Sequence, residues 1–150
     1  MERLQQMVLQ FHQAKDCAWQ QRPGPLPWAH AALRLVLIRE EYEELVQAAM
    51  DNNLEGIADA LADLLYVVMG AGLAWGIDLE PVFIEVHRSN MTKAGGQRRT
   101  QRKVLKGPQY RPPRIRAILD ILRQRSIGRN EANTGLRPSS WTAEDLEPIE

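Results

Sequence analysis

Three consecutive polar residues, Asp51–Asn53, separate two long segments whose composition and periodicity predict helices over about 29–50 and 54–75. A turn this short requires the second helix to fold back along the first, so the two helices should pack antiparallel. The stretch Arg22–Trp28, with three prolines and a glycine, ends the preceding helical segment, and Gly76 ends the second long helix. The chain is therefore expected to be all-α, with an antiparallel helical pair at its centre.

Shorter helices are expected on both sides of this pair. Apolar residues recur at helical spacing near the N-terminus and again after residue 114; they are Leu4, Val8, Phe11 and Ala18, then Ile115, Ile118, Leu119 and Leu122. Asp78 is a good N-cap for a further helix that runs to about Asn90, with Pro81 in its first turn. Together these segments predict a small antiparallel helical bundle.

The second long segment is apolar nearly all round. Ala60–Ile77 is long enough to consider as a membrane span, but Asp63 lies inside it, Asp59 just precedes it, and no other span accompanies it. A helix buried in a bundle or between subunits is the better interpretation, so no membrane partner is expected. One chain offers too little cover for such a helix. The bundle is therefore expected to be completed by homo-oligomerisation, as a dimer or a tetramer.

The net charge is zero, yet charge is segregated along the chain. Residues 1–85 hold 5 basic against 13 acidic side chains, residues 86–129 hold 13 against 1, and residues 130–150 hold 1 against 5. Lys93–Pro113 is rich in basic residues, glycine and proline, which predicts a basic loop or short hairpin near the C-terminal third. We expect a helical domain over 1–125 and a polar C-terminal extension over 126–150.

Cys17 is the single cysteine, so no internal disulfide can form. The N-terminal sequence MERLQQMVLQFHQ lacks the apolar core of a secretory signal. Both features fit a reducing compartment and predict a cytoplasmic location.

Three carboxylates of the first long helix, Glu40, Glu41 and Glu44, lie on the side that should face the core. At about 100° per residue they share an arc with Leu37, and Glu43 lies at the edge of that arc. Burying unpaired carboxylates is costly, so they require protons, basic partners or a metal ion. A run of glutamates taken alone is more often a solvated face.

The second long helix carries a matching acidic pair. Asp59 and Asp63 are four residues apart, and Tyr66 continues their face. In an antiparallel pair these acids can meet the three glutamates, while Arg34 and Arg39 are the only basic residues on the first long helix. Hard divalent cations are natural partners of clustered carboxylates, so the pattern predicts a Mg²⁺ site, with Mn²⁺ as an alternative ion.

The chain resembles the all-α NTP pyrophosphohydrolase superfamily, which includes the MazG-like proteins and their dimeric dUTPase relatives. The residues REEYEEL (Arg39–Leu45) fit the EExxE element of that family, and DALADLLYVVMGAGLAWGID (Asp59–Asp78) fits its second acidic helix. EVHRSNMTK and KVLKGPQYRPP also match MazG-like members, so the resemblance covers about residues 8–122. One departure stands out. Ala60 occupies the place of the first acid in the ExxD element, and Asp59 is the nearest acid.

This resemblance implies magnesium-dependent hydrolysis of a nucleoside triphosphate to the monophosphate and pyrophosphate, with a role in nucleotide-pool house-cleaning. The metal ligands that it implies are Glu40, Glu41, Glu44, Asp59 and Asp63, of which Asp59 could also bind through water. Glu41 is the candidate for orienting or deprotonating the attacking water.

The resemblance also implies substrate contacts from Asn90 and Lys93, with Arg88 and Lys106 as weaker candidates. The nucleobase preference is not readable from the sequence. Aromatic side chains that could shape a base pocket are Trp19, Trp28, Tyr66 and Trp75. Tyr110 could stack on a base or anchor a turn.

The basic segment 88–116 leaves a second interpretation open, a helical nucleic-acid-binding or adaptor module. No aromatic residue interleaves the run from Gln97 to Lys106, and no nucleic-acid motif surrounds it. A nucleic-acid partner is therefore not expected. His87 is interpreted as a packing or hydrogen-bonding residue, because no second His or Cys is placed to join it in a metal site.

Overall fold

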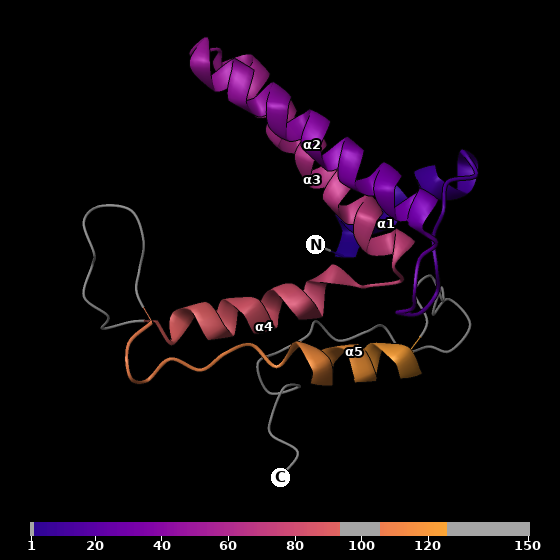
Figure 1. The fold of residues 1–150 in the computed structure, drawn as a ribbon, viewed down its shortest axis with the longest axis vertical. Coiled ribbons are helices and arrows are strands. Elements are labelled where there is room, and N and C mark those ends of the chain that lie inside the picture. Colours follow the sequence, from indigo (N-terminus) through magenta and orange to yellow (C-terminus); the bar gives the residue numbers. More distant parts are fainter. Residues whose placement is uncertain (1, 94–105, 126–150) are drawn as a thin grey trace. The chain divides into compact units, whose positions relative to one another are not determined.

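The computed structural model describes residues 2–93 and 106–125 (Figure 1). Its helices are α1 (Glu2–Ala14), α2 (Trp28–Met50), α3 (Leu54–Ala74), α4 (Leu79–Met91) and α5 (Ile115–Gln124). No strand occurs within these described ranges, so the all-α prediction is confirmed. Most of the predicted basic loop and the whole extension over 126–150 lie outside them.

The turn between α2 and α3 is held by its own side chains. Asn52 adopts the left-handed conformation with φ 51°, and Asn53 Oδ1 accepts a hydrogen bond from the Gly56 N–H at 3.1 Å as the N-cap of α3. On the other side, Gln47 Nε2 donates to Asp51 Oδ2 at 2.9 Å. The two long helices run side by side and antiparallel, as the three-residue turn predicted (Figure 1).

The C-terminal end of α3 is closed by two backbone hydrogen bonds around Gly76, whose φ is 68°. The Gly76 N–H donates to Leu73 O at 2.9 Å, and the Ile77 N–H donates to Gly72 O at 2.8 Å, which is the Schellman pattern. A Cβ at position 76 would lie 2.0 Å from the carbonyl oxygen of Arg22. Glycine is therefore required there both by the backbone angle and by the close approach of another segment.

The proline-containing segment before α2 is bound to this end of α3. The Gln20 N–H donates to Leu73 O at 2.9 Å, and its side-chain Nε2 donates to Ala74 O at 2.8 Å. The Gly24 N–H donates to Trp75 O at 3.2 Å. The bonds to Ala74 O and Trp75 O satisfy carbonyl groups that the end of a helix otherwise leaves open, and Leu73 O accepts from Gln20 in addition to Gly76.

The core of this part of the chain lies between α1 and the C-terminal third of α3. It is formed by Val8 and Leu9 of α1 with Met69 and Leu73 of α3, and Trp19 packs against them. By length and composition α3 could cross a membrane, but its last residues supply this core.

The apolar stripe predicted for α1 was only partly right. Leu4 is 45% exposed and Phe11 is 44% exposed, whereas Gln5 and His12 are buried with Val8. The polar side chains are buried because each has a partner. Gln5 Nε2 donates to Ile77 O at 2.9 Å, and Gln5 Oε1 accepts from the N–H of Leu79, the first residue of α4, at 3.0 Å.

The chain forms two compact units. In the part that the structure describes, the first unit runs up to Leu79 and includes the end of α5, and the second runs from Glu80 to Ile121. The second unit contains α4, the irregular segment 106–114 and most of α5. The amphipathic face predicted for α5 is confirmed, since Ile118 and Leu122 are its buried side chains.

Candidate functional site

Four of the five predicted metal ligands act on the carboxyl group of the fifth, Glu41. Partial burial and the negative charges of the four neighbouring acids raise the pKa of Glu41 above its usual value; in order of effect, these acids are Glu44, Asp63, Glu40 and Asp59. Two acids of this set come from α3 and three from α2. The antiparallel pair therefore brings together the acids that helical spacing had placed on facing sides.

No basic side chain among the described residues pairs with these five acids, which we call the acidic cluster. Arg39 instead approaches Glu43, with 3.7 Å between Nε and Oε1, on the exposed side of α2. Arg34 is turned toward α1 and is only 7% exposed. Arg34 and Arg39 therefore contact other groups, and neither offsets the repulsion between Glu41 and its neighbouring acids.

The expectation that these glutamates point into a core requires correction. Glu41 is half-buried, but Glu40, Glu44, Asp59 and Asp63 are exposed. The charges of the four other acids do act on Glu41. However, α2 packs on α3 along a narrow strip, and a helical wheel gives the direction of a side chain without the depth of its burial.

The acidic cluster suits a hard cation by its donor chemistry. It consists of carboxylate oxygens without cationic partners, and a divalent ion would relieve the repulsion on Glu41. Within residues 2–93 and 106–125, no three acidic, His or Cys side chains are yet arranged as a ready metal-binding group. The cluster thus supplies the ligand type and the charge, and its exposed side chains would have to close around an ion.

His12 of α1 and Arg34 of α2 form a buried pair of basic side chains, and Arg34 lies on the same face of α2 as Glu41, seven residues earlier. His12 Nδ1 lies 3.0 Å from Ala18 O and must donate to it, so Nε2 is left as an acceptor, 3.5 Å from Arg34 Nη1. Burial lowers the pKa of His12, and the charge of Arg34 adds to this effect. The Nε of Arg34 has no hydrogen-bond partner among the residues that the structure describes. Gly70 makes room, since a Cβ there would lie 2.9 Å from His12 Nε2.

Sequence reasoning missed the His12–Arg34 pair. The predicted stripe of the first segment is defined by apolar residues, and His12 is not one of them. Gly70 of α3 was a usable signal, because it continues the face of Asp63 and Tyr66 and leaves room there for a side chain from another helix.

The aromatic candidates are distributed unequally. Tyr66 is partly exposed on the acidic face of α3, and its ring meets Phe11 edge-on at 5.8 Å between centroids. Trp19 packs against the core, whereas Trp28 is 76% exposed. Trp75 is the C-cap of α3. Of these four candidates, Tyr66 is nearest to the acidic cluster in the sequence, three residues after Asp63.

The predicted substrate-binding residues of the basic region fall into two groups. Lys93 Nζ donates to Asn90 Oδ1 at 2.6 Å, and Lys106 Nζ lies 4.5 Å from the centroid of the Tyr110 ring. Arg88 is engaged differently, because Nε and Nη2 each donate to Glu85 at 2.8 Å. Sequence reasoning did not single out Glu85, although its spacing of three residues from Arg88 on a helix was a signal.

Parts of the chain are similar to known proteins. A stretch of 48 residues is 56% identical to part of the uncharacterized protein L479 of Acanthamoeba polyphaga mimivirus, a match that spans 32% of this chain and 19% of that relative. Residues 8–90 match the model of the phosphoribosyl-ATP pyrophosphohydrolase family. This range includes the whole acidic cluster and covers more than half of the chain. The chain thus belongs to the phosphoribosyl-ATP pyrophosphohydrolase family, within the all-α MazG-like NTP pyrophosphohydrolase superfamily.

Proposed function

We propose that the protein is a magnesium-dependent nucleoside triphosphate pyrophosphohydrolase that releases a nucleoside monophosphate and pyrophosphate. The observation that carries this proposal is the acidic cluster, five carboxylates on two facing helices without a basic partner among the described residues. Within a pyrophosphohydrolase family, such a cluster is suited to the cations that accompany a triphosphate.

Each group has a role in this proposal. Glu40, Glu44 and Asp63 would hold Mg²⁺, with Asp59 as a direct or water-mediated ligand, and the bound ion would supply Lewis-acid stabilisation of the phosphate charges. Glu41 orients the attacking water and accepts its proton. The water oxygen bonds to the α-phosphorus, the bond from this phosphorus to the α–β bridging oxygen breaks, and pyrophosphate leaves.

The base and sugar of the substrate are a separate part of the proposal. The family is named for phosphoribosyl-ATP, which itself contains an adenosine triphosphate group. Tyr66 is suited to contact a nucleobase, because it is partly exposed and one turn from Asp63. Removal of unwanted nucleotides from the cellular pool is the physiological role we propose.

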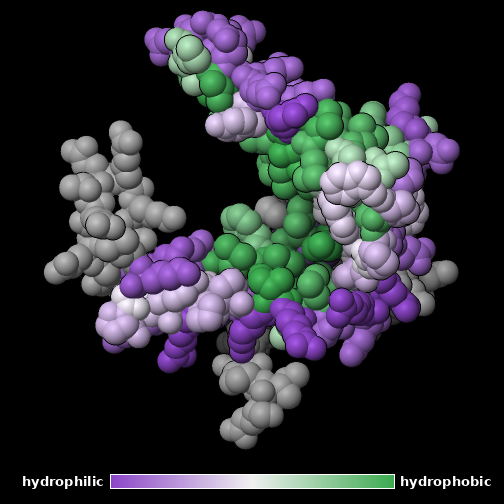
Figure 2. All heavy atoms as spheres, in the orientation of Figure 1, coloured by the Kyte–Doolittle hydropathy of each residue, from purple (hydrophilic) through white to green (hydrophobic). Residues whose placement is uncertain are grey.

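We also propose that the active form is a homo-oligomer. Figure 2 shows hydrophobic surface continuing along the α2–α3 pair, with hydrophilic residues at its tip. Large apolar side chains exposed on these helices include Leu33, Leu35, Val36, Val46, Leu61, Leu65 and Val68. A second copy of the chain would cover them. A monomeric mass by light scattering at assay concentrations would contradict this part of the proposal.

The test is identification of products. The full chain would be incubated with Mg²⁺ and a panel of NTPs, dNTPs and phosphoribosyl-ATP, beside Glu41→Gln and the matched control Glu43→Gln. Monophosphate and pyrophosphate from the wild type and from Glu43→Gln, with a loss of at least 100-fold in Glu41→Gln, would support the proposal. Orthophosphate with a diphosphate would overturn the reaction. No turnover of any nucleotide, with salt-sensitive binding of oligonucleotides, would favour the nucleic-acid-binding alternative.

A further inference from the structure

Arg34 of α2 is a buried cation that lacks a counterion. The residue is only 7% exposed, and among the residues that the structure describes it forms no ion pair with a carboxylate. Its Nη1 lies 3.5 Å from His12 Nε2, while its buried Nε has no partner in the same part of the chain. Burying a charge and a donor in this way is costly. A ligand that brings hydrogen-bond acceptors would remove that cost.

His12 holds Arg34 in place without neutralising it. Its Nδ1 donates to Ala18 O, and burial lowers its pKa, so the neutral ring presents the lone pair of Nε2 to the guanidinium. Both side chains lie against Gly70 of α3, where a Cβ would be 2.9 Å from His12 Nε2 and 3.5 Å from Arg34 Nη1. Three helices of the first unit therefore set the position of this guanidinium.

The contacts of two glycines establish the register of α2 against α3. A Cβ at Gly56 would lie 3.2 Å from Ala48 Cβ, and Gly70 faces Arg34. Fourteen residues separate the members of these two pairs on α2, and fourteen separate them on α3. The register is therefore constant over about four helical turns.

Glu41 and Asp63 lie midway between these two pairs and so face each other. Arg34 and the acidic cluster are consequently on one seam, which is the line of contact between α2 and α3. They are separated by seven residues, or about 10 Å along α2. All of these residues belong to the first unit, so the two helices themselves determine this separation.

Two aromatic rings lie between the acidic cluster and Arg34. Tyr66 lies three residues after Asp63 and four before Gly70, on their face of α3. Its ring meets the Phe11 ring edge-on at 5.8 Å between centroids, and the Phe11 ring lies 6.5 Å from that of His12. Both Tyr66 and Phe11 are partly exposed. The seam thus carries acids at one end, accessible aromatic surface in the middle and the donors of a buried cation at the other end.

We propose that Arg34 is a specificity-determining residue, which binds the edge of a nucleobase that carries an oxo group. The order of groups along the seam is the order within a nucleotide, with phosphates at the acidic cluster, the flat base against Tyr66 and Phe11, and its far edge at Arg34. The entering base displaces the edge-on contact of the two rings, and no hydrogen bond within the described residues holds the Tyr66 hydroxyl. This inference rests on the proposed function for its substrate.

The chemistry of the guanidinium selects the base. The N–H groups of Arg34 can only donate, so they accommodate the carbonyl oxygen that hypoxanthine, guanine and uracil present at this edge. Adenine and cytosine carry an amino group there, and its hydrogens would face those of the guanidinium. A base of the second kind leaves the buried donors unpaired, which is the most effective way for a site to reject a close analogue.

The test compares nucleotides that differ at this edge. With Mg²⁺, kcat/KM of the wild type should be about 10-fold or more higher for inosine triphosphate than for ATP, and likewise for UTP than for CTP. Arg34→Met keeps the apolar stem and removes the donors, so both ratios should fall to within about twofold of unity. The matched control is Arg39→Gln, on the exposed side of α2, which should keep the ratios of the wild type.

The same variants distinguish base recognition from a structural role. Arg34→Met removes an unpaired buried charge and should not lower the melting temperature of the ligand-free protein. Arg34→Lys keeps the charge but loses the planar fork, so it should also reduce the ratios, and it decides the question if Arg34→Met does not fold. Wild-type ratios in the folded variants would overturn the inference, and a lower melting temperature beside them would identify a structural role.

Binding of monophosphates separates this inference from the proposed function. Calorimetry with inosine and adenosine monophosphates needs no turnover, and Kd should be about 10-fold lower for the inosine compound in the wild type but equal for the two in Arg34→Met. A wild type that hydrolyses no nucleotide yet shows this difference would refute the proposed function and support the Arg34 site. Hydrolysis without preference for oxo bases would overturn the inference alone. Neither hydrolysis nor binding would overturn both.

Discussion

Glu41 and Glu85 are glutamates on helices of the same chain, and their surroundings are opposite. Glu85 is buried, and the Arg88 guanidinium bonded to it lowers its pKa to about 2. Glu41 is half-buried among four other acids, and its pKa is raised. The first carboxylate is satisfied by the protein itself and stabilises a local structure. The second is left unsatisfied by the described protein, which is typical of a side chain kept for a ligand.

The largest expected effect in this comparison is the loss of the Glu85 charge. Glu85→Gln should lower the free energy of unfolding by about 3 kcal/mol, because removal of one partner of a buried ion pair leaves the other without compensation. Urea denaturation followed by circular dichroism measures the change. A loss below about 1 kcal/mol would show that Arg88, which is partly exposed, finds equivalent partners in water.

Lowering the pH should gradually remove the contribution of the Glu85 charge to the stability of the fold. The pKa of Glu85 is about 2 in the folded chain against 4.5 for an ordinary glutamate, so its stabilising effect is complete above pH 4.5 and declines as the pH falls toward 2. The melting temperature of the wild type should therefore fall more steeply between pH 5 and pH 3 than that of Glu85→Gln. Parallel curves for the two proteins would contradict the assignment.

Divalent cations should stabilise the protein through the acidic cluster. At a concentration tenfold above Kd, a ligand that binds only the folded state adds about 1.4 kcal/mol. A thermal shift with Mg²⁺ or Mn²⁺ that disappears in Asp63→Asn but persists in Glu85→Gln would separate the two carboxylate environments. An equal shift in both variants would mean that the ion binds elsewhere.

The smallest effect should have the opposite sign. Without metal, Glu41→Gln removes a repelled charge and should raise the free energy of unfolding by about 0.5 kcal/mol, the size of a like-charge pair on a helix. Glu43→Gln, two residues away, loses only an exposed contact with Arg39 and should lower stability by 0.5 kcal/mol or less. If Glu41→Gln lowered the free energy of unfolding as much as Glu85→Gln is expected to, the two glutamates would not have opposite surroundings.

The parts of the fold that local sequence determines were predicted well. Pro27, the turn Asp51–Asn53 and Gly76 set the ends of α2 and α3 within one residue of their observed bounds. The sequence could predict that the acids of the cluster lie close together, because residues three or four apart lie on one face of a helix. Their exposure could not be predicted, since it depends on what covers α2 beyond its strip of contact with α3.

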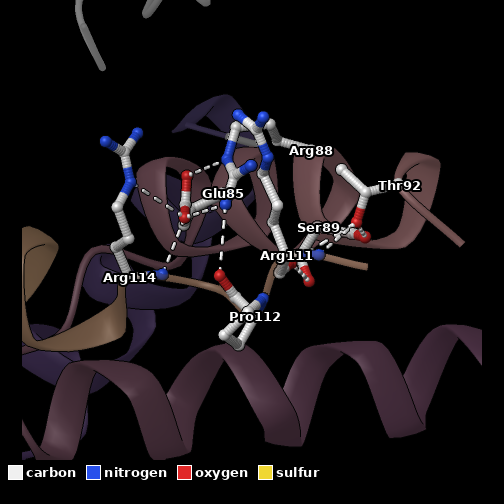
Figure 3. A network of polar contacts seen from close by, with 7 residues as sticks. All are labelled: Glu85, Arg88, Ser89, Thr92, Arg111, Pro112 and Arg114. Carbon is white, nitrogen blue, oxygen red and sulfur yellow. Dashed lines mark hydrogen bonds and ion pairs between the residues drawn. The ribbon is translucent and has the colours of Figure 1, made fainter. Parts of the chain in front are cut away.

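The Glu85 contacts could not be predicted for a different reason. Apart from Arg88, the partner of Glu85 is Arg114, and the neighbouring side chains of α4, Arg88 and Ser89, bond to Pro112 O and Arg111 O; all three partners are more than twenty residues away and bond through backbone groups (Figure 3). Backbone partners leave no mark in residue type. The burial of His12 beside Arg34 is similar, because two bases placed together follow no pattern of hydropathy.

Gly76 has a consequence for related proteins. A side chain at this position would overlap the Arg22 carbonyl, so mutation away from glycine is incompatible with the present route of residues 20–25 across the end of α3. During divergence the two features should be retained or lost together. The identity of one residue could therefore divide homologues into those that enter their first long helix by this route and those that have evolved another entry, without any structure of them being solved.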